Sequence, residues 1–394
     1  MRNGKVLRIV SAIALILSLT LMLAACGNDQ SEPRVETAAD NQSNTQEEAA
    51  ASEDWRIGFN VWGTAGNPTF DLMAEIIGET LMTLGTRGSR ANDDHMADRT
   101  LENIQNFISA GVDGLVMQAA APPVLPPAAE ASMNSQIPFV LGINTGGDDD
   151  RAVIAANNPY YVGSVSADMV RDGEIAAQQA LDDGHRTAIL IGGNVGNKHQ
   201  DDRVAGFTQV FESGGGVVLD AARCTSPAET QEKATALLSA NRDADCIYAM
   251  VGDYIPGTVV AADLLDLSHI PIYASNINTD SVEHMRSGRV VAGGTGNDLA
   301  GGIAAAMLIN HLDGHAILDA DGNKPELIIY PFIVTADNVD NYIAIFNAPG
   351  VSPFHEEIAR KLSWRYNSDV TYQTFLDVIN NDLTLEGLMA AHGF

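Results

Sequence analysis

Residues 99–118 read RTLENIQNFISAGVDGLVMQ, and this stretch is the clearest indication of the fold. Apolar residues recur at helical spacing over 99–110, whereas 114–118 is a short apolar run typical of a buried strand. An amphipathic helix that leads within a few residues into such a strand indicates a parallel sheet built from strand–helix–strand units.

The same alternation continues on both sides of this stretch. The first series has expected strands at 56–61, 114–118, 138–143 and 152–155, with helices at 68–84, 99–110 and 124–135. The second series has a long helix at 160–183, strands at 187–191, 217–221, 246–250, 270–274 and 290–294, and helices at 203–213, 228–240, 258–265 and 281–287. A helix at 299–312 and a strand at 326–334 follow. Two series of similar length predict an α/β fold with two similar, doubly wound parallel-sheet lobes.

The expected lobes are discontinuous in the sequence. We expect 55–157 plus 297–326 to form the N-terminal lobe, and 158–296 plus 327–394 to form the C-terminal lobe. The last fifty residues should be a helical extension that wraps one lobe. Three segments should cross between the lobes, near 157–159, 295–297 and 325–330, and flex together as a hinge.

The N-terminus has the organisation of a secretory signal. Arg2, Lys5 and Arg8 precede an apolar run at 9–25 that is too short to span a membrane comfortably. The run ends in Leu-Ala-Ala-Cys-Gly at 23–27, which resembles the bacterial lipobox.

This match implies removal of residues 1–25 and attachment of lipid to Cys26. Residues 26–54 are rich in Asn, Gln, Ser, Thr and Glu, so they should form a flexible linker between the lipid and the folded protein. An uncleaved N-terminal anchor is the alternative. In both cases the protein is tethered to the membrane and faces outward.

The charge and the cysteines limit the possible partners and crosslinks. The chain has 22 Lys and Arg residues against 51 Asp and Glu, a formal net charge of −29. Such a surface repels nucleic acid and anionic lipid headgroups, so we expect membrane contact through the lipid anchor only. Cys224 comes at the end of one expected strand and Cys246 at the start of the next, and in a doubly wound sheet these two strands flank a third. Because a disulfide needs Cα atoms within about 7 Å, we expect two buried free thiols.

Side-chain amides are concentrated after the expected strands. Ligands bind beyond the carboxyl ends of parallel strands, and two facing lobes would form one cleft there. The candidate ligand contacts are Trp62, Asn67, Phe70, Gln118, Asn144, Asn157, Arg203, Asp253 and Asn276. Amides both donate and accept hydrogen bonds, as sugar hydroxyls do. For each asparagine, capping a helix or closing a turn remains the alternative role.

Several short phrases, taken in order, resemble the ribose-type sugar-binding proteins of ABC importers, which have the type I periplasmic binding protein fold. These are NPTF at 67–70, NIQNFI at 103–108, GVDGLV at 111–116, IPFV at 137–140, DRVAGF at 202–207 and RSG at 286–288. The resemblance covers roughly residues 55–341. It implies ligand contacts from Asn67 and Phe70, and a guanidinium of Arg203 that grips a ring oxygen and a neighbouring hydroxyl.

Other positions of the resemblance are less regular. Gln118 stands where the family often has Asn or Asp, and Asn276 stands where it usually has Asp. Trp62 could offer a flat apolar face to sugar C–H groups. The role of Asp253 is open, because Val-Gly-Asp at 251–253 replaces the family's Asn-Asp pair. Ile143-Asn144 also stands where an Asp is common, and Ser275 where an aromatic residue is common.

Arg203 has an alternative role as a surface residue paired with Asp201 or Asp202. The loop GNVGNK at 193–198 lacks the Gly-Lys-Ser/Thr ending of a phosphate-binding loop, and the run at 148–150 is expected to be an exposed loop. The sequence has no nucleophile elbow, zinc cluster or paired-carboxylate motif. We therefore expect no enzymatic activity, no metal and no cofactor.

These observations predict a monomeric, lipid-anchored, extracytoplasmic receptor on the outer face of the membrane. It would capture a small polar ligand, a monosaccharide or polyol, and deliver it to an ABC permease. One alternative is a receptor of the same fold that signals to a sensor kinase or chemoreceptor. The other is a receptor for a nucleoside or another ligand that is not a sugar.

Overall fold

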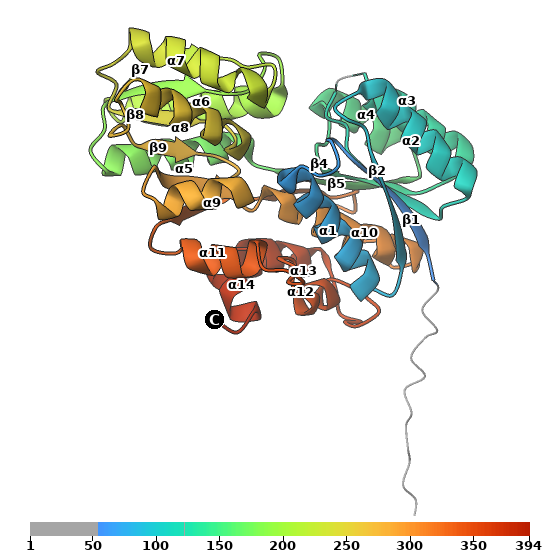
Figure 1. Cartoon of the computed structure of the whole chain (residues 1–394). Helices are drawn as coiled ribbons and strands as arrows, with labels where there is room; N and C mark the ends of the chain where they lie inside the picture. The colour runs from blue at the N-terminus through green and yellow to red at the C-terminus, as the bar shows by residue number, and fades with distance from the viewer. Residues whose placement is uncertain (1–53, 122) are drawn as a thin grey trace, which may run out of the picture. The chain divides into compact units, whose positions relative to one another are not determined.

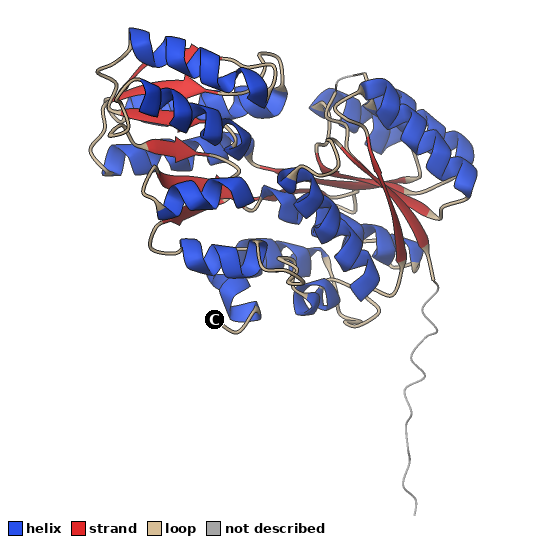
Figure 2. Ribbon diagram, viewed as in Figure 1, coloured by secondary structure: helices blue, strands red, loops and turns tan. Residues whose placement is uncertain are grey.

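The computed structural model describes residues 54–121 and 123–394 (Figure 1). The expected signal, the lipidation site Cys26 and all but the last residue of the expected linker lie outside the described residues. The described chain forms two sheets, each flanked by helices (Figure 2). An α/β fold with two parallel-dominated sheets is confirmed.

The first sheet consists of six parallel strands in the order β11-β5-β4-β3-β1-β2. They are β1 (Arg56–Val61), β2 (Arg87–Asn92), β3 (Gly114–Met117), β4 (Phe139–Ile143), β5 (Tyr161–Ala167) and β11 (Glu326–Ile329). The flanking helices are α1 (Pro68–Thr83), α2 (Ala97–Ala110), α3 (Leu125–Ser135), α4 (Asp148–Asn157) and α10 (Ala300–Leu312). We call this sheet and these helices the first lobe. The central strands β3 and β4 are buried on both faces, which explains their continuous apolar sequences.

The second sheet has the order β12-β10-β9-β8-β6-β7 and is parallel except for β12, which runs antiparallel to β10. Its strands are β6 (Thr187–Ile191), β7 (Val217–Ala222), β8 (Cys246–Ala249), β9 (Ile272–Ala274), β10 (Val290–Thr295) and β12 (Phe332–Thr335). Its helices are α5 (Met169–Asp182), α6 (Lys198–Ser213), α7 (Thr230–Ala240), α8 (Ile255–Leu264) and α9 (Thr279–Arg286). We call this group the second lobe. Short 3₁₀ turns precede α7, α8 and α10: η1 (Pro227–Glu229), η2 (Gly252–Tyr254) and η3 (Asn297–Leu299).

Several local expectations were wrong. The expected strand at 152–155 lies in helix α4, and the long helix expected at 160–183 is strand β5 followed by helix α5. The acidic run at 148–150 is the first turn of α4, where negative charge is favourable beside the helix dipole. The strand expected at 326–334 is divided into β11 and β12, which belong to different sheets. Strand β2 was not predicted because it is a polar, largely exposed edge strand.

The chain crosses three times between the two sheets. The crossings lie at Asp168 between β5 and α5, at Thr295–Asn297 after β10, and at Tyr330–Pro331 between β11 and β12. The first crossing is therefore about ten residues later than the one expected at 157–159, because β5 pairs with β4 and β11 in the first sheet. For the same reason residues 161–167 and 326–329 belong to the first lobe. Asp168 N donates to Ile329 O at 3.0 Å, so two of the crossings lie side by side.

The C-terminal extension contacts both lobes, and not one lobe as expected. It contains α11 (Val339–Phe346), α12 (Glu356–Lys361), α13 (Tyr372–Asp377), the π-helix η4 (Val378–Asp382) and α14 (Leu385–Ala391). Tyr342 donates through its hydroxyl to Ile277 O at 3.1 Å in the second lobe, whereas Asn310 of α10 donates to Leu362 O at 2.7 Å in the first.

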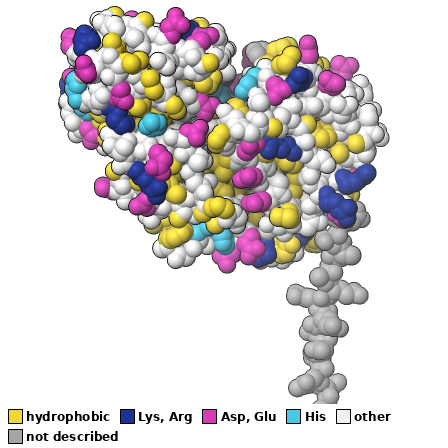
Figure 3. All heavy atoms as spheres, viewed as in Figure 1, with side chains coloured by type: hydrophobic (Ala, Val, Ile, Leu, Met, Phe, Trp, Pro, Cys, Tyr) yellow, Lys and Arg dark blue, Asp and Glu magenta, His cyan; other side chains and the backbone are white. Residues whose placement is uncertain are grey.

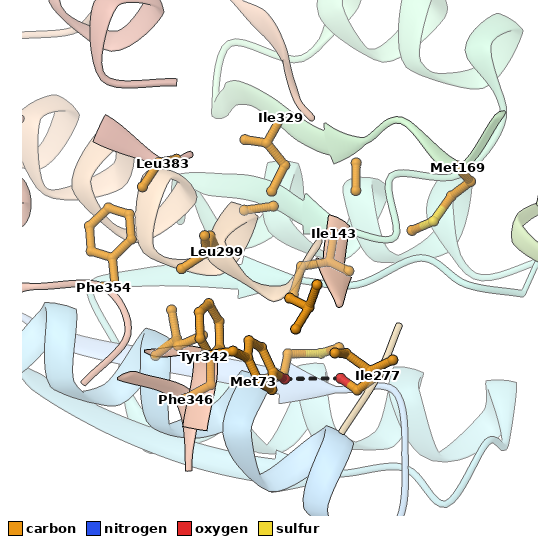
Figure 4. Close-up of a cluster of buried hydrophobic side chains, with 14 of the residues drawn as sticks. Met73, Ile143, Met169, Ile277, Leu299, Ile329, Tyr342, Phe346, Phe354 and Leu383 are labelled. Carbon is orange, nitrogen blue, oxygen red and sulfur yellow. Dashed lines mark hydrogen bonds between the residues drawn. The ribbon is translucent and has the colours of Figure 1, made fainter. Parts of the chain in front are cut away.

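The extension also shares one apolar core with both lobes, as the labelled side chains of Figure 4 show. Met73 and Ile143 come from the first lobe, Ile277 from the second, and Tyr342 and Phe354 from the extension. Burial of this cluster ties the extension to the lobes through the hydrophobic effect.

The surface and the cysteines agree with the composition. Figure 3 shows acidic side chains spread over the viewed face with fewer basic ones among them, in keeping with the net charge of −29. Within the part of the chain that the structure describes, Cys224 and Cys246 are buried free thiols, as expected. Within residues 54–121 and 123–394, no helix has the length and apolar composition needed to cross a bilayer.

Candidate functional site

Helices α5 and α6 touch backbone to backbone, and this contact builds the centre of the candidate site. A Cβ atom on Gly173 would lie 2.2 Å from the carbonyl oxygen of Arg203, and one on Gly206 would lie 2.0 Å from that of Val170. Only glycine permits such an approach. As a result Asp172, in the first turn of α5, lies against Arg203 of α6.

Arg203 is buried and held in place by an ion pair. Its side chain is only 5% exposed, and its Nε donates to Asp172 Oδ2 at 2.8 Å. Neither terminal nitrogen of its guanidinium has a hydrogen-bond partner among the described residues. The alternative of a surface pair is wrong, because Asp201 pairs with Arg223 and Asp202 pairs with Lys198.

Several side-chain oxygens of the candidate site are buried without partners in the described part of the chain. Asn297, at the crossing after β10, donates through Nδ2 to Asp172 Oδ2 at 3.0 Å. In the described part of the chain, Asp172 Oδ1, Asn276 Oδ1 and Asn297 Oδ1 are enclosed and accept no hydrogen bond. Nearly all buried polar groups in proteins are paired, so these acceptors are available to a donor from a ligand or from water. Asn276 also has a left-handed backbone, with φ of 46°, which is a costly conformation for a residue other than glycine.

Asp253 joins the two lobes. Asn278 Nδ2 donates to its Oδ1 at 2.7 Å, and Thr69 Oγ1 and Asn67 Nδ2 approach its two oxygens at 3.4 Å each. Asn67 and Asn278 also accept hydrogen bonds as the N-caps of α1 and α9, so each combines the capping role with a contact across the site. Burial raises the pKa of Asp253, while the hydrogen bonds from Asn67 and Thr69 act against this rise.

Aromatic rings lie next to Asn67. Trp62 and Phe70 both meet His95 edge to face, with ring centroids 5.7 Å and 5.0 Å away. His95 is exposed and has a φ of 62° in the turn after β2. The two predicted aromatic residues, Trp62 and Phe70, thus both contact His95, which follows the unpredicted strand β2.

The remaining candidates differ in their placement. Gln118 and Asn144 lie together, with Asn144 Nδ2 donating to Gln118 Oε1 at 2.7 Å. Gln118 is buried and its Nε2 lies 2.9 Å from Met73 Sδ, so its amide is engaged within the protein and orients Asn144. Asn157 is not brought to the site. It is the exposed last residue of α4, just before β5 begins. It therefore lies near the amino ends of the parallel strands, whereas the candidate site lies at their carboxyl ends.

Asp172 and Asp298 belong to the site but were not predicted. Asp172 lies within the segment that was expected to be one long helix, and Asp298 lies in η3, immediately after a crossing. Burial raises the pKa of Asp298 to about 7, with Arg203 opposing the rise and Asp172 and Asp253 adding to it. Asp172 follows β5, which was not predicted as a strand, whereas Asp298 lies shortly after the predicted strand β10. Position after a predicted strand could therefore have drawn attention to Asp298 but not to Asp172.

The donor set does not include a metal cluster. Across residues 54–121 and 123–394, no group of three or more His, Cys, Asp or Glu side chains is arranged to hold a metal ion. The site instead combines one anchored guanidinium, several amides, carboxylates and a group of aromatic rings. Such a set can bind a polar, uncharged molecule that both donates and accepts hydrogen bonds.

The fold and the site define a two-lobed solute receptor of the type I periplasmic binding protein class. The chain belongs to the periplasmic binding protein domain family, whose model matches residues 57–316. No curated protein sequence matches the chain.

Solved structures share the fold at low sequence identity. The periplasmic binding protein of the arabinose ABC transporter from Shewanella sp. ANA-3, bound to arabinofuranose, has a TM-score of 0.63 and 19% identity, covering 73% of this chain and 94% of its own. A solute-binding protein from Bacillus halodurans C-125 with bound myo-inositol has a TM-score of 0.63 and 15% identity, covering 74% and 98%. The periplasmic ribose ABC transporter structure from Conexibacter woesei has a TM-score of 0.62 and 17% identity, covering 75% and 96%.

Proposed function

We propose that the protein is an extracytoplasmic receptor that binds a small polyhydroxylated molecule, a monosaccharide or cyclic polyol, and delivers it to an ABC permease. The anchored guanidinium of Arg203 carries this proposal. Its Nε is fixed by Asp172, and its two terminal nitrogens have no partner among the described side chains and main-chain groups. A planar guanidinium held in this way can donate two parallel hydrogen bonds to neighbouring oxygens of a ligand.

The other side chains of the candidate site support the same ligand class. Asn276 and Asn297 supply amides, and Trp62 and Phe70 supply apolar ring faces from the first lobe. Sugars and cyclic polyols present hydroxyl groups at their edges and C–H groups on their faces, which match these two kinds of side chain. The arabinose and myo-inositol complexes of structurally similar proteins agree with this choice. The three crossings would allow the lobes to close around the ligand as a hinge.

A thermal-shift screen tests the proposal. The panel should contain pentoses, hexoses, inositols and nucleosides, each added to the full chain in detergent. A ligand at 100 times its dissociation constant adds about 2.7 kcal/mol to the free energy of unfolding, so a true ligand should raise the melting temperature clearly. A response to nucleosides but to no sugar or polyol would favour the nucleoside alternative. No response to any member would count against the proposed function.

We further propose that the receptor is anchored by lipid on Cys26, outside the described residues, and faces away from the cytoplasm. The lipobox at residues 23–27 supports this anchoring. We expect Cys26→Ser to abolish incorporation of radiolabelled palmitate and to leave an unprocessed precursor, because the thiolate is the acceptor of the lipid. Ser18→Ala in the apolar run is the matched control and should label as the parent does. Equal labelling of the parent and the Cys26→Ser variant would contradict lipid anchoring at this position.

A further inference from the structure

The C-terminal extension, residues 336–394, lies outside the part of the chain that the family model matches. That match ends at residue 316, whereas α11 begins at Val339. The extension is nevertheless packed into the molecule, because apolar side chains from Tyr342 to Leu388 belong to the core that it shares with both lobes. An addition buried in this way stabilises the arrangement in which both lobes contact it.

One attachment of the extension is to the second lobe, through α11. Tyr342 is fully buried and donates through its hydroxyl to Ile277 O at 3.1 Å. Phe346 stacks on Tyr342 with the ring centroids 4.7 Å apart, and its ring lies 6.0 Å from that of Phe332 in β12. Two aromatic rings therefore hold α11 on the second lobe.

The other attachment is to the first lobe, at the end of α10. Asn310 is fully buried, and its side chain donates to Leu362 O at 2.7 Å and accepts from Trp364 N at 2.7 Å. Arg365 Nε donates to Asp313 Oδ2 at 2.6 Å, and the two side chains are only 7% and 10% exposed. The extension is thus fixed to the first lobe by a buried amide and a buried ion pair.

A folded unit, and not a slack segment of chain, joins the two attachments. Helix α14 packs on α11, and the ring nitrogens of His392 lie 2.7 Å from Leu388 O and 3.0 Å from Ser352 O. Lys361 of α12 pairs with Asp382 of η4 at 2.6 Å. Because packed cores do not stretch continuously, separation of the two lobes must break one of the attachments.

The same core surrounds the three crossings between the lobes. Met169, Leu299 and Ile329 each lie within a few residues of one crossing, and all three belong to the core that contains Tyr342 and Phe354 (Figure 4). A hinge rotation changes the backbone at the crossings, so these side chains would have to repack against the extension. The extension therefore opposes rotation at the place where rotation begins.

We propose that the C-terminal extension is a brace, which limits the separation of the two lobes and keeps the open arrangement rare even before a solute binds. Since a solute enters through the open arrangement, the brace also sets how often the site is accessible. This inference goes beyond the proposed function, because it concerns the motion of the lobes and does not depend on which solute the site takes.

The experiment measures the distance between spin labels on the two lobes by pulsed electron paramagnetic resonance, with no solute added. The labels are attached to Met133→Cys on α3 and Val260→Cys on α8, which are both exposed. The full chain, in detergent, also carries Cys26→Ser, and the two other cysteines of the chain, Cys224 and Cys246, are buried.

The variants compared in this labelled background are Phe346→Ala and the matched control Phe107→Ala. The two phenylalanines are 6% and 8% exposed, but Phe107 belongs to a core cluster whose members all come from the first lobe. The parent and Phe107→Ala should give one narrow distance distribution. Phe346→Ala should add a longer distance, because loss of the ring weakens the attachment of α11 and should raise the open population by about ten-fold or more.

Three results would overturn the brace. The first is a parent that already shows two well-populated distances, and the second is a Phe346→Ala distribution as narrow as that of the parent. The third is equal broadening in Phe346→Ala and Phe107→Ala, because any loss of core packing would then be sufficient. If Phe346→Ala does not fold, Phe346→Leu and Phe107→Leu replace the two variants and are judged in the same way. None of these measurements contains a solute, so failure of the brace leaves the proposed function to its own thermal screen.

Discussion

Arg203→Lys should lose ligand affinity nearly as completely as Arg203→Ala, by about 100-fold, which corresponds to about 3 kcal/mol. Lysine keeps the charge but lacks the Nε that Asp172 holds at 2.8 Å, and it cannot offer two parallel donors from a planar group. The loss should therefore appear in affinity for whichever sugar or polyol responds in the thermal screen, measured by calorimetry. Near-parental affinity in Arg203→Ala would contradict the assignment.

The ion pair complicates this comparison, and a double variant resolves it. Arg203→Ala leaves Asp172 buried without its cation, and breaking a buried pair from one side costs about 3–5 kcal/mol of stability. Arg203→Gln combined with Asp172→Asn removes both charges and should recover much of that stability. If Arg203 contacts the ligand, the double variant should melt close to the parent and still fail to bind. Restored binding in the double variant would reduce Arg203 to a structural partner of Asp172.

Gly206→Ala should lower the free energy of unfolding by about 3 kcal/mol or more, as measured by denaturant unfolding. The added Cβ would lie 2.0 Å from the carbonyl oxygen of Val170, and a backbone atom cannot move aside as a flexible side chain can. Separation of α5 from α6 should also pull Asp172 away from Arg203, so ligand affinity should fall in whatever fraction still folds.

Gly78→Ala is the matched control, since Gly78 also lies inside a helix, α1. A Cβ atom there would meet only the ring of Phe59, at 3.8 Å, which is an ordinary contact. Because alanine has the better helix propensity by about 1 kcal/mol, Gly78→Ala should be neutral or slightly stabilising. Equal costs for the two variants would show that the close crossing of α5 and α6 is not required.

The sequence predicted those elements whose local pattern has a single interpretation. Helix α2 and strand β3 came from periodicity and a short apolar run, because the buried face of a helix and a fully buried strand leave different spacings in the chain. Strand β5 failed this test, since YVGSVSA is a run of small and apolar residues that also suits a buried helix. Strand β2 failed for the opposite reason, because an edge strand exposed to solvent needs no apolar pattern.

Part of the candidate site was predictable because its residues lie within a few positions after a predicted strand, and Arg203 was predicted from the resemblance of DRVAGF at 202–207. Asn67, Asp253 and Asn276 were found from their position after a strand, since parallel strands deliver their carboxyl ends to one edge. Asn157 was misplaced because the segment predicted as a strand before it is helix α4. A residue that ends a helix before the next strand lies at the amino ends of the strands and not at their carboxyl ends.

The sequence by itself determined the alternation of strands and helices, the two series and the amides that follow the strands. All of these depend on side-chain spacing over fewer than about twenty residues. The tertiary structure alone decided that Asp172 meets Arg203, because the two lie 31 positions apart in the sequence. They meet because α5 and α6 approach closely at Gly173 and Gly206. The tertiary structure also decided that Asp298 is buried without a hydrogen-bond partner among the described residues. The burial of a side chain and its hydrogen-bond partners depend on how elements far apart in the sequence pack together, and this packing cannot be inferred from the local spacing of residues.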